Sequence, residues 1–280
     1  MRKTLFFLLL LVMSELFIGC PAPKKRAVLD KDAELIDVRV YYVRHGLSCG
    51  NIAPVYAEFT LQDPSLSQTG LENSQRAGLN FQYYLQREGI SLDFVGSSSL
   101  MRAKQTAMKM FPAQIAAQQG VLYEIADMGE CLRLIPEAWQ KSNTPHELAV
   151  QQLKLAEQTS WQGVQLNDKY GGGALRNEVD YEHFLTNTLP SIVGDLQKKQ
   201  GKKQYHIAIV THSLTMKYQL GCVRNPGDFF TEKPTNNEVY FIDYKYQLHQ
   251  GLELVSEGSC QRAMEVDDST PGPQDQNSCQ

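Results

Sequence analysis

Segments rich in β-branched and aromatic residues alternate along this chain with segments of helical periodicity. The segments that predict strands are 38–43, 93–96, 121–125 and 206–210, followed by a terminal hairpin or edge pair at 238–244 and 252–256. The segments that predict helices are 67–87, 99–110, 214–220, and 177–199 with a kink at Pro190. Strands that alternate with helices indicate helix layers on a largely parallel sheet. We therefore expect an α/β fold, a three-layer α/β/α sandwich with a mostly parallel central sheet.

Three polar segments each follow directly after a predicted strand. They are Arg44-His45-Gly46, Ser97-Ser98-Ser99 with Arg102 one turn into the next helix, and Thr211-His212. In such sheets ligands bind beyond the carboxyl ends of the strands, so the three segments should meet at one edge. Arginine binds phosphate oxygens through its planar fork of donors, and a neutral imidazole can attack phosphorus. The pattern predicts a phosphoryl-transfer site.

Four motifs resemble those of the histidine phosphatase superfamily, which has the phosphoglycerate mutase-like fold. They are VRHGLSCGN at 43–51, LSQTG at 66–70, SSSLMRAKQTA at 97–107 and VTHS at 210–213, and they come in the order found in that family. The resemblance implies that His45 is the nucleophile and forms a phosphohistidine. It also implies that Arg44 and Arg102 bind the phosphoryl oxygens and that His212 is a second histidine that contacts the phosphate.

The leaving group needs a proton donor, and the sequence offers two carboxylates. Glu124 fits a mutase-like L-x-E spacing inside strand 121–125, whereas Glu130 lies beyond the end of that strand. A residue past a strand end reaches the site, so we favour Glu130 and keep Glu124 as the alternative. Asn51 matches a position that lines the pocket in the family, and its alternative interpretation is a loop or helix-cap residue.

The expected activity is hydrolysis of phosphate monoesters without a metal ion or cofactor, because two arginines and a histidine can neutralise the phosphoryl charge. The substrate would be a small phosphorylated molecule or a phosphoprotein. The alternatives are a phosphoglycerate mutase-like phosphoryl isomerase and a non-catalytic module that binds a phosphorylated ligand. The net charge of −4 does not indicate the basic surface that nucleic-acid-binding proteins have. The sequence leaves the oligomeric state open.

The N-terminal segment has the pattern of a secretory signal. Basic Arg2-Lys3 precedes an apolar run at 5–13, and Gly19-Cys20 resembles a bacterial lipoprotein signal. Ordinary cleavage and an uncleaved anchor are the alternatives to lipidation. We therefore expect an exported protein that is periplasmic, secreted or tethered to a membrane through Cys20. The predicted divisions are a signal at 1–20, a tether at 21–36, the phosphatase domain at 37–260 with an insertion at about 131–175, and a disordered tail at 261–280.

Six cysteines occur without a C-x-x-C pair, so their spacing argues against a zinc site. Export would permit disulfides, and Cys260 with Cys279 is one candidate pair. Cys49, four residues after His45, is interpreted as a bystander thiol, with an oxidation-sensitive role as the alternative.

Overall fold

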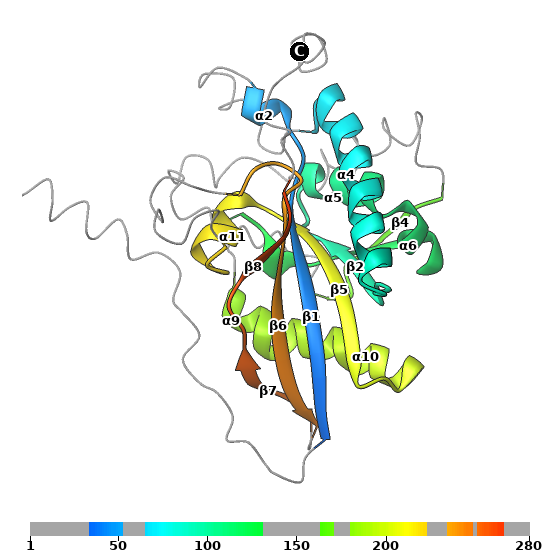
Figure 1. Ribbon diagram of the computed structural model, residues 1–280, viewed down its shortest axis with the longest axis vertical. Helices are drawn as coiled ribbons and strands as arrows, with labels where there is room; N and C mark the ends of the chain where they lie inside the picture. The colour runs from blue at the N-terminus through cyan, green and yellow to red at the C-terminus, as the bar shows by residue number, and fades with distance from the viewer. Residues whose placement is uncertain are drawn as a thin grey trace, which may run out of the picture.

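A central sheet of eight strands organises the protein (Figure 1). The computed structural model describes residues 34–52, 65–130, 163–170, 180–222, 234–248 and 251–265. The strand order is β4-β3-β2-β5-β1-β6-β7, and β8 also pairs with β6. The strands are β1 (Glu34–Arg44), β2 (Phe94–Ser97), β3 (Val121–Glu124), β4 (Gln165–Asn167), β5 (Gln204–Thr211), β6 (Val239–Leu248), β7 (Leu252–Glu257) and β8 (Gln261–Met264). From β4 to β1 all neighbours are parallel, whereas β6, β7 and β8 pair antiparallel, so the mostly parallel sheet is confirmed.

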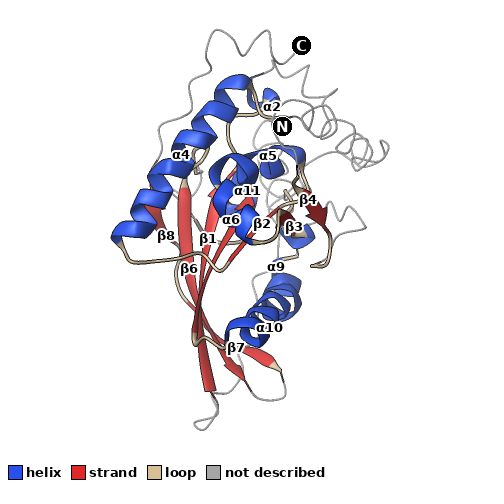
Figure 2. Cartoon of the chain, turned by 90° about the vertical axis from the view of Figure 1, so that its right-hand side faces the viewer, coloured by secondary structure: helices blue, strands red, loops and turns tan. Residues whose placement is uncertain are grey.

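Helices cover both faces of the sheet, as the three-layer prediction requires. One face carries α4 (Gln68–Arg87), α5 (Met101–Met110) and α6 (Pro112–Ala117). The other face carries α9 (Tyr181–His183), the π-helical turn η3 (Phe184–Thr188), α10 (Leu189–Gln200) and α11 (Ser213–Tyr218). Two short helices lie at connections, α2 (Cys49–Ile52) and the 3-10 turn η1 (Ala126–Met128). Figure 2 shows α4 and α10 on opposite sides of the sheet.

The central strand β1 is buried on both faces. Val38, Val40 and Tyr42 pack in the core beneath α10, whereas Tyr41 and Val43 pack in the core beneath α4. A strand covered on both sides needs apolar residues at successive positions, which explains the continuous apolar run in the sequence. Each large apolar side chain buried in this way contributes about 1.5–3 kcal/mol.

The first two long predicted helices are confirmed, with one addition. The side chain of Ser67 caps α4 by accepting a hydrogen bond from Gly70 N at 3.0 Å. The helix α5 ends at Met110, before Pro112, as predicted. Pro112 then begins α6, a helix that was not predicted. Proline suits the first turn of a helix because the N–H that it lacks would have no partner there.

The prediction of one kinked helix over 177–199 is wrong in its details. The described part consists of α9, the π-helical η3 and α10, and the irregular turn lies before Pro190 rather than at it. Pro190 occupies the first turn of α10, where it leaves the helix intact. The segment ends at Gly201, which has a φ of 63° and adopts the left-handed conformation that favours glycine.

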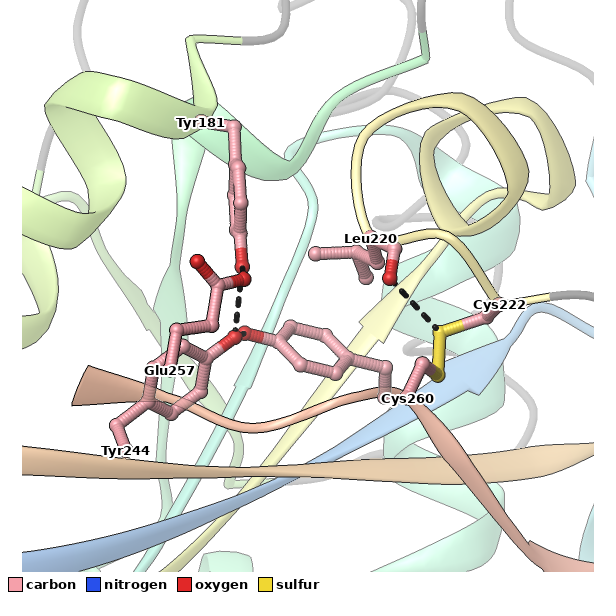
Figure 3. Close-up of a disulfide and its surroundings, with 7 residues drawn as sticks. Tyr181, Leu220, Cys222, Tyr244, Glu257 and Cys260 are labelled. Atoms are coloured by element: carbon pink, nitrogen blue, oxygen red, sulfur yellow. Dashed lines mark hydrogen bonds between the residues drawn. A yellow bond between two sulfur atoms is a disulfide. The ribbon is translucent and has the colours of Figure 1, made fainter. Parts of the chain in front are cut away.

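The C-terminal strands extend further than predicted. β6 and β7 form the expected antiparallel pair, but residues 261–264, placed in a disordered tail by the sequence interpretation, form β8 against β6. A disulfide between Cys222 and Cys260 holds the chain at the start of β8 (Figure 3). The predicted pairing of Cys260 with Cys279 is therefore wrong. Cys49 is also disulfide-bonded, which rules out its interpretation as a free thiol.

The structure also shifts the predicted boundaries of the tether and of the insertion. β1 begins at Glu34 and includes the fully buried Ile36, so the strand starts inside the segment interpreted as a tether. β4, assigned to the insertion, extends the sheet beside β3. The N-terminal signal and most of the insertion predicted at about 131–175 lie outside the described residues. Among the helices of the described ranges, none is long and apolar enough to cross a membrane.

Candidate active site

The carboxyl ends of β1, β5 and β2 bring the predicted residues to one edge of the sheet. Arg44 pairs in register with Thr211, and Ser97 pairs with Val210, so the residues that follow these strands are neighbours. The rings of His45 and His212 lie with their centroids 5.1 Å apart. Parallel strands thereby place two histidines from distant parts of the sequence side by side.

His45 is buried and held in one tautomer. Its Nδ1 lies 2.7 Å from the carbonyl oxygen of Gly46, and because a carbonyl only accepts, Nδ1 donates and Nε2 keeps the lone pair. Burial lowers the pKa of His45 well below its usual range, and the charges of Arg102 and Arg44 lower it further. The imidazole is thus neutral near pH 7, with an unprotonated Nε2 suited to nucleophilic attack.

Gly46 allows a close backbone approach beside His45. A Cβ at this position would lie 2.4 Å from Oγ of Ser74 and 3.1 Å from the carbonyl oxygen of Gly70. The amide of Gly46 donates to Oγ1 of Thr106 at 2.9 Å. The glycine of the RHG triplet therefore lets the segment after β1 lie directly against α4 and α5.

His212 is fully buried, and its two nitrogens have different surroundings. Nε2 lies 2.9 Å from Oγ of Ser98, whereas Nδ1 has no hydrogen-bond partner among the described residues and lies 3.9 Å from Oε2 of Glu130. Burial lowers the pKa of His212 well below its usual range, with Arg102 and Arg44 acting in the same direction. A neutral His212 that is protonated at Nδ1 has one donor available for an anion.

Arg44 and Arg102 supply the positive charge of the cluster. Nη1 of Arg44 donates to the carbonyl oxygen of Pro234 at 2.6 Å, while its Nε is buried and unpaired within the described part of the chain. Burial lowers the pKa of Arg44 to about 10, so the group stays charged at neutral pH. Nη2 of Arg102 forms an ion pair with Oε2 of Glu130. Two guanidinium groups at one edge of the sheet can bind the oxygens of a phosphoryl group.

The structure separates the two candidate proton donors. Glu130 belongs to the cluster, through Arg102 and near His212. Glu124, at the end of β3, is 6% exposed and forms an ion pair with the buried Lys104 of α5. The geometry therefore favours Glu130, and its role in proton transfer stays a prediction.

Several hydrogen bonds fix the loop that carries Glu130. Oγ1 of Thr211 donates to Met128 O at 2.8 Å, and Oγ1 of Thr215 donates to Gly129 O at 2.5 Å. Asp127, which is 1% exposed, accepts a hydrogen bond from Thr188 at 2.5 Å and lies 2.9 Å from Nδ1 of His183.

The π-helical turn η3 explains why Thr188 and His183 both contact Asp127. Thr188 and His183 are five residues apart, a spacing that a π-helical turn brings closer to one side than an α-helix does. The sequence analysis missed this contact, because nothing in the sequence marks a π-helical turn.

Asn51 lies in α2, and its side chain forms hydrogen bonds with Ser48, three residues earlier. Its Oδ1 accepts hydrogen bonds from the amide of Ser48 at 3.0 Å and from Oγ of Ser48 at 2.9 Å. These contacts are typical of a capping residue, which was the alternative interpretation. A role of Asn51 in phosphate binding stays a prediction.

Two motif positions gain a structural role that the sequence analysis did not assign. In the LSQTG segment, a Cβ at Gly70 would lie 1.9 Å from Leu47 O, so only glycine permits this packing. In the SSSLMRAKQTA segment, Oε1 of Gln105 accepts a hydrogen bond from Leu66 N at 2.5 Å. Gly70 thus lets the segment after His45 pack against α4, and Gln105 holds the residue that begins the LSQTG segment.

The described residues contain no group of three or more His, Cys, Asp or Glu side chains arranged to hold a metal ion. The positive charge of the site comes instead from the buried guanidinium groups of Arg44 and Arg102.

Comparison with known proteins gives matches only among solved structures. No protein-family profile and no curated protein match the chain. The ecdysone phosphate phosphatase of Bombix mori is 13% identical with a TM-score of 0.49, and the match covers 78% of this chain and 92% of that one. A phosphoserine phosphatase of Entamoeba histolytica is 17% identical with a TM-score of 0.34, covering 79% and 97%. A phosphoglycerate mutase of Bacillus anthracis is 19% identical with a TM-score of 0.39, covering 75% and 89%.

These identities and TM-scores are low, so the roles of the site residues rest on the geometry of this chain. The motifs at 43–51, 66–70, 97–107 and 210–213 resemble those of the histidine phosphatase superfamily.

Proposed function

We propose that this protein is a metal-independent phosphomonoester hydrolase that works through a phosphohistidine on His45. The observation that carries the proposal is the neutral, buried imidazole of His45, which lies beside two arginines and a second histidine. Its Nδ1 donates a hydrogen bond to Gly46 O. That arrangement offers a nucleophile, Nε2, and enough positive charge for an anionic phosphoryl group.

The first half of the reaction transfers the phosphoryl group to the protein. Nε2 of His45 attacks phosphorus in line with the ester oxygen, and the P–O bond to the leaving group breaks as the P–N bond forms. Arg44 and Arg102 neutralise the phosphoryl oxygens, and Nδ1–H of His212 donates to one of them. Glu130 gives its proton to the leaving oxygen, so that an alcohol departs.

The second half returns the protein to its starting state. The Glu130 carboxylate takes a proton from a water molecule as that water attacks phosphorus. The P–N bond then breaks and inorganic phosphate leaves. His45 is again neutral, with its lone pair on Nε2.

Hydrolysis of p-nitrophenyl phosphate tests the proposal. We expect release of inorganic phosphate that persists in the presence of EDTA, is inhibited by vanadate and is abolished in His45→Ala. His206→Ala is the matched control, because His206 lies at the opposite end of β5 and is partly buried. Activity that persists in His45→Ala, or that EDTA alone removes, would refute the mechanism.

We also propose that the chain is exported and tethered through Cys20, on the basis of the signal-like segment at 1–20. Labelling with radioactive palmitate in a bacterial host tests the tether. A label that disappears in Cys20→Ser supports lipidation, whereas an unlabelled wild-type protein excludes it.

A further inference from the structure

The carboxylate of Glu130 lies among the groups that would bind phosphate. Its Oε2 forms an ion pair with Arg102 and lies 3.9 Å from Nδ1 of His212. The charge of Arg44 also acts on it, and His45 lies in the same cluster. Glu130 thus lies where these four groups converge, and its carboxylate places an anion beside them.

A carboxylate leaves part of this site unused. Nε of Arg44 and Nδ1 of His212 are both buried, and neither has a hydrogen-bond partner among the described residues. Buried polar atoms are costly to leave unpaired, so they indicate a ligand that reaches further than Glu130 does. A tetrahedral dianion presents more acceptor oxygens and twice the charge of a carboxylate.

We propose that the Glu130 carboxylate forms an ion pair with Arg102 before substrate binds, that an incoming phosphoryl group displaces it from Arg102, and that Glu130 then takes up the proton that it later donates. The inference rests on the proposed function and deepens it. Once the dianion takes over Arg102, the carboxylate has lost its cation and lies beside two new negative charges. It then takes up one proton from solvent, which converts the carboxylate into the carboxylic acid.

This order of events removes a conflict within the mechanism. A proton donor must be protonated before it acts. Before a phosphoryl group binds, burial raises the pKa of Glu130, but the charge and hydrogen bond of Arg102 and the charge of Arg44 act the other way, and the net direction is downward. Glu130 is therefore ionised before substrate binds, and only the bound phosphoryl group makes it an acid.

Sulfate binding tests the inference without any turnover. Sulfate is a tetrahedral dianion across about pH 5–8, so it contributes no titration of its own. Isothermal titration of the full chain in two buffers with different ionisation enthalpies gives both the affinity and the number of protons taken up. We expect the wild type to take up about one proton per sulfate and Glu130→Gln to take up about one fewer, with about tenfold tighter binding.

Glu72→Gln is the matched control, because it removes a carboxylate from the surface of α4 and should behave as the wild type. The other ionisable groups that face Glu130 are Arg102 on α5, Arg44 at the end of β1, His45 directly after it, and His212 after β5. All of them remain in Glu130→Gln, so the difference between the two proteins reports Glu130 alone.

Equal proton uptake by wild type and Glu130→Gln would overturn the inference, as would weaker sulfate binding by the variant or no binding by either protein. Circular dichroism establishes that the variant is folded. If it is not, the wild type decides: affinity that rises as pH falls from about 7 to 5 supports the inference, and constant affinity overturns it. If proton uptake and affinity follow this expectation but the protein does not hydrolyse p-nitrophenyl phosphate, the displacement of Glu130 is supported and the proposed function is contradicted.

Discussion

Replacing Ser98 with alanine tests how the fold orients His212. Ser98 Oγ accepts a hydrogen bond from Leu100 N at 3.3 Å and lies 2.9 Å from Nε2 of His212. Because Ser98 Oγ accepts from Leu100 N, its hydroxyl hydrogen can donate to Nε2 of His212. The proton of the neutral ring then resides on Nδ1, the nitrogen near Glu130. In Ser98→Ala the ring loses the partner that selects this tautomer.

The structure sets the size of the effect. His212 is fully buried, so Nε2 loses its hydrogen bond without access to bulk water. Leaving a buried acceptor unpaired costs about 1–3 kcal/mol. If that cost falls on the transition state, kcat/KM for p-nitrophenyl phosphate falls about 5- to 150-fold.

Steady-state kinetics with two further variants make the result specific. Ser98→Thr keeps a hydroxyl and should retain most of the activity, whereas Ser99→Ala makes the same change one residue along and should match the wild type. If kcat/KM of Ser98→Ala stays within about twofold of the wild type, Ser98 does not orient His212. An equal loss in Ser98→Thr would also contradict the proposed donor role of the hydroxyl.

Three other expectations follow from the contacts described. Asp127→Asn loosens the loop that carries the proposed proton donor, so kcat should fall about tenfold for an alkyl phosphate and less for p-nitrophenyl phosphate, whose leaving group needs no proton. Replacing both Cys222 and Cys260 with serine opens a link between residues 38 apart, and urea denaturation should show a loss of about 4 kcal/mol. Burial holds the pKa of His45 and His212 well below 6.5, so unfolding takes up protons below about pH 6.5. The free energy of unfolding should therefore fall with decreasing pH, as measured by urea denaturation at several pH values.

Each of these three has a control. Asp195→Asn removes a partly exposed carboxylate on α10 and should leave both substrates unaffected, and an equal loss on both substrates in Asp127→Asn would indicate general damage. A dithiol reductant should destabilise the wild type more than the double serine variant, which retains the disulfide of Cys49, and an equal loss in both contradicts the disulfide prediction. Replacing both histidines with asparagine should flatten the pH dependence, and an unchanged slope would assign it to other groups.

The strands that carry the site could be predicted because the physics is local. β1 and β5 lie inside a mostly parallel sheet and are apolar at successive positions, and each ends at a charged or polar residue. The convergence of Arg44 and His212 then follows from the rule that parallel strands share a carboxyl edge.

The features that could not be predicted depend on distant partners. The sequence favoured Glu130 but could not exclude Glu124, because the ion pair of Glu124 with Lys104 joins β3 to a helix from another part of the chain. The strand β8 depends on the disulfide from Cys260 to Cys222, and six cysteines allow many pairings. The π-helical turn before Pro190 has no local signal, since the contacts with Asp127 come from another part of the chain.

Trapping the phosphorylated protein tests the central claim most directly. The chain is mixed with phosphate-labelled substrate, quenched in alkali within the first turnovers and digested, and the labelled peptide is located by mass spectrometry. A phosphate on nitrogen survives alkali and is lost in acid. The account predicts an acid-labile label on His45 that is absent from His45→Ala. A label on any other residue, or hydrolysis with no phosphorylated intermediate under conditions that slow its breakdown, would contradict it.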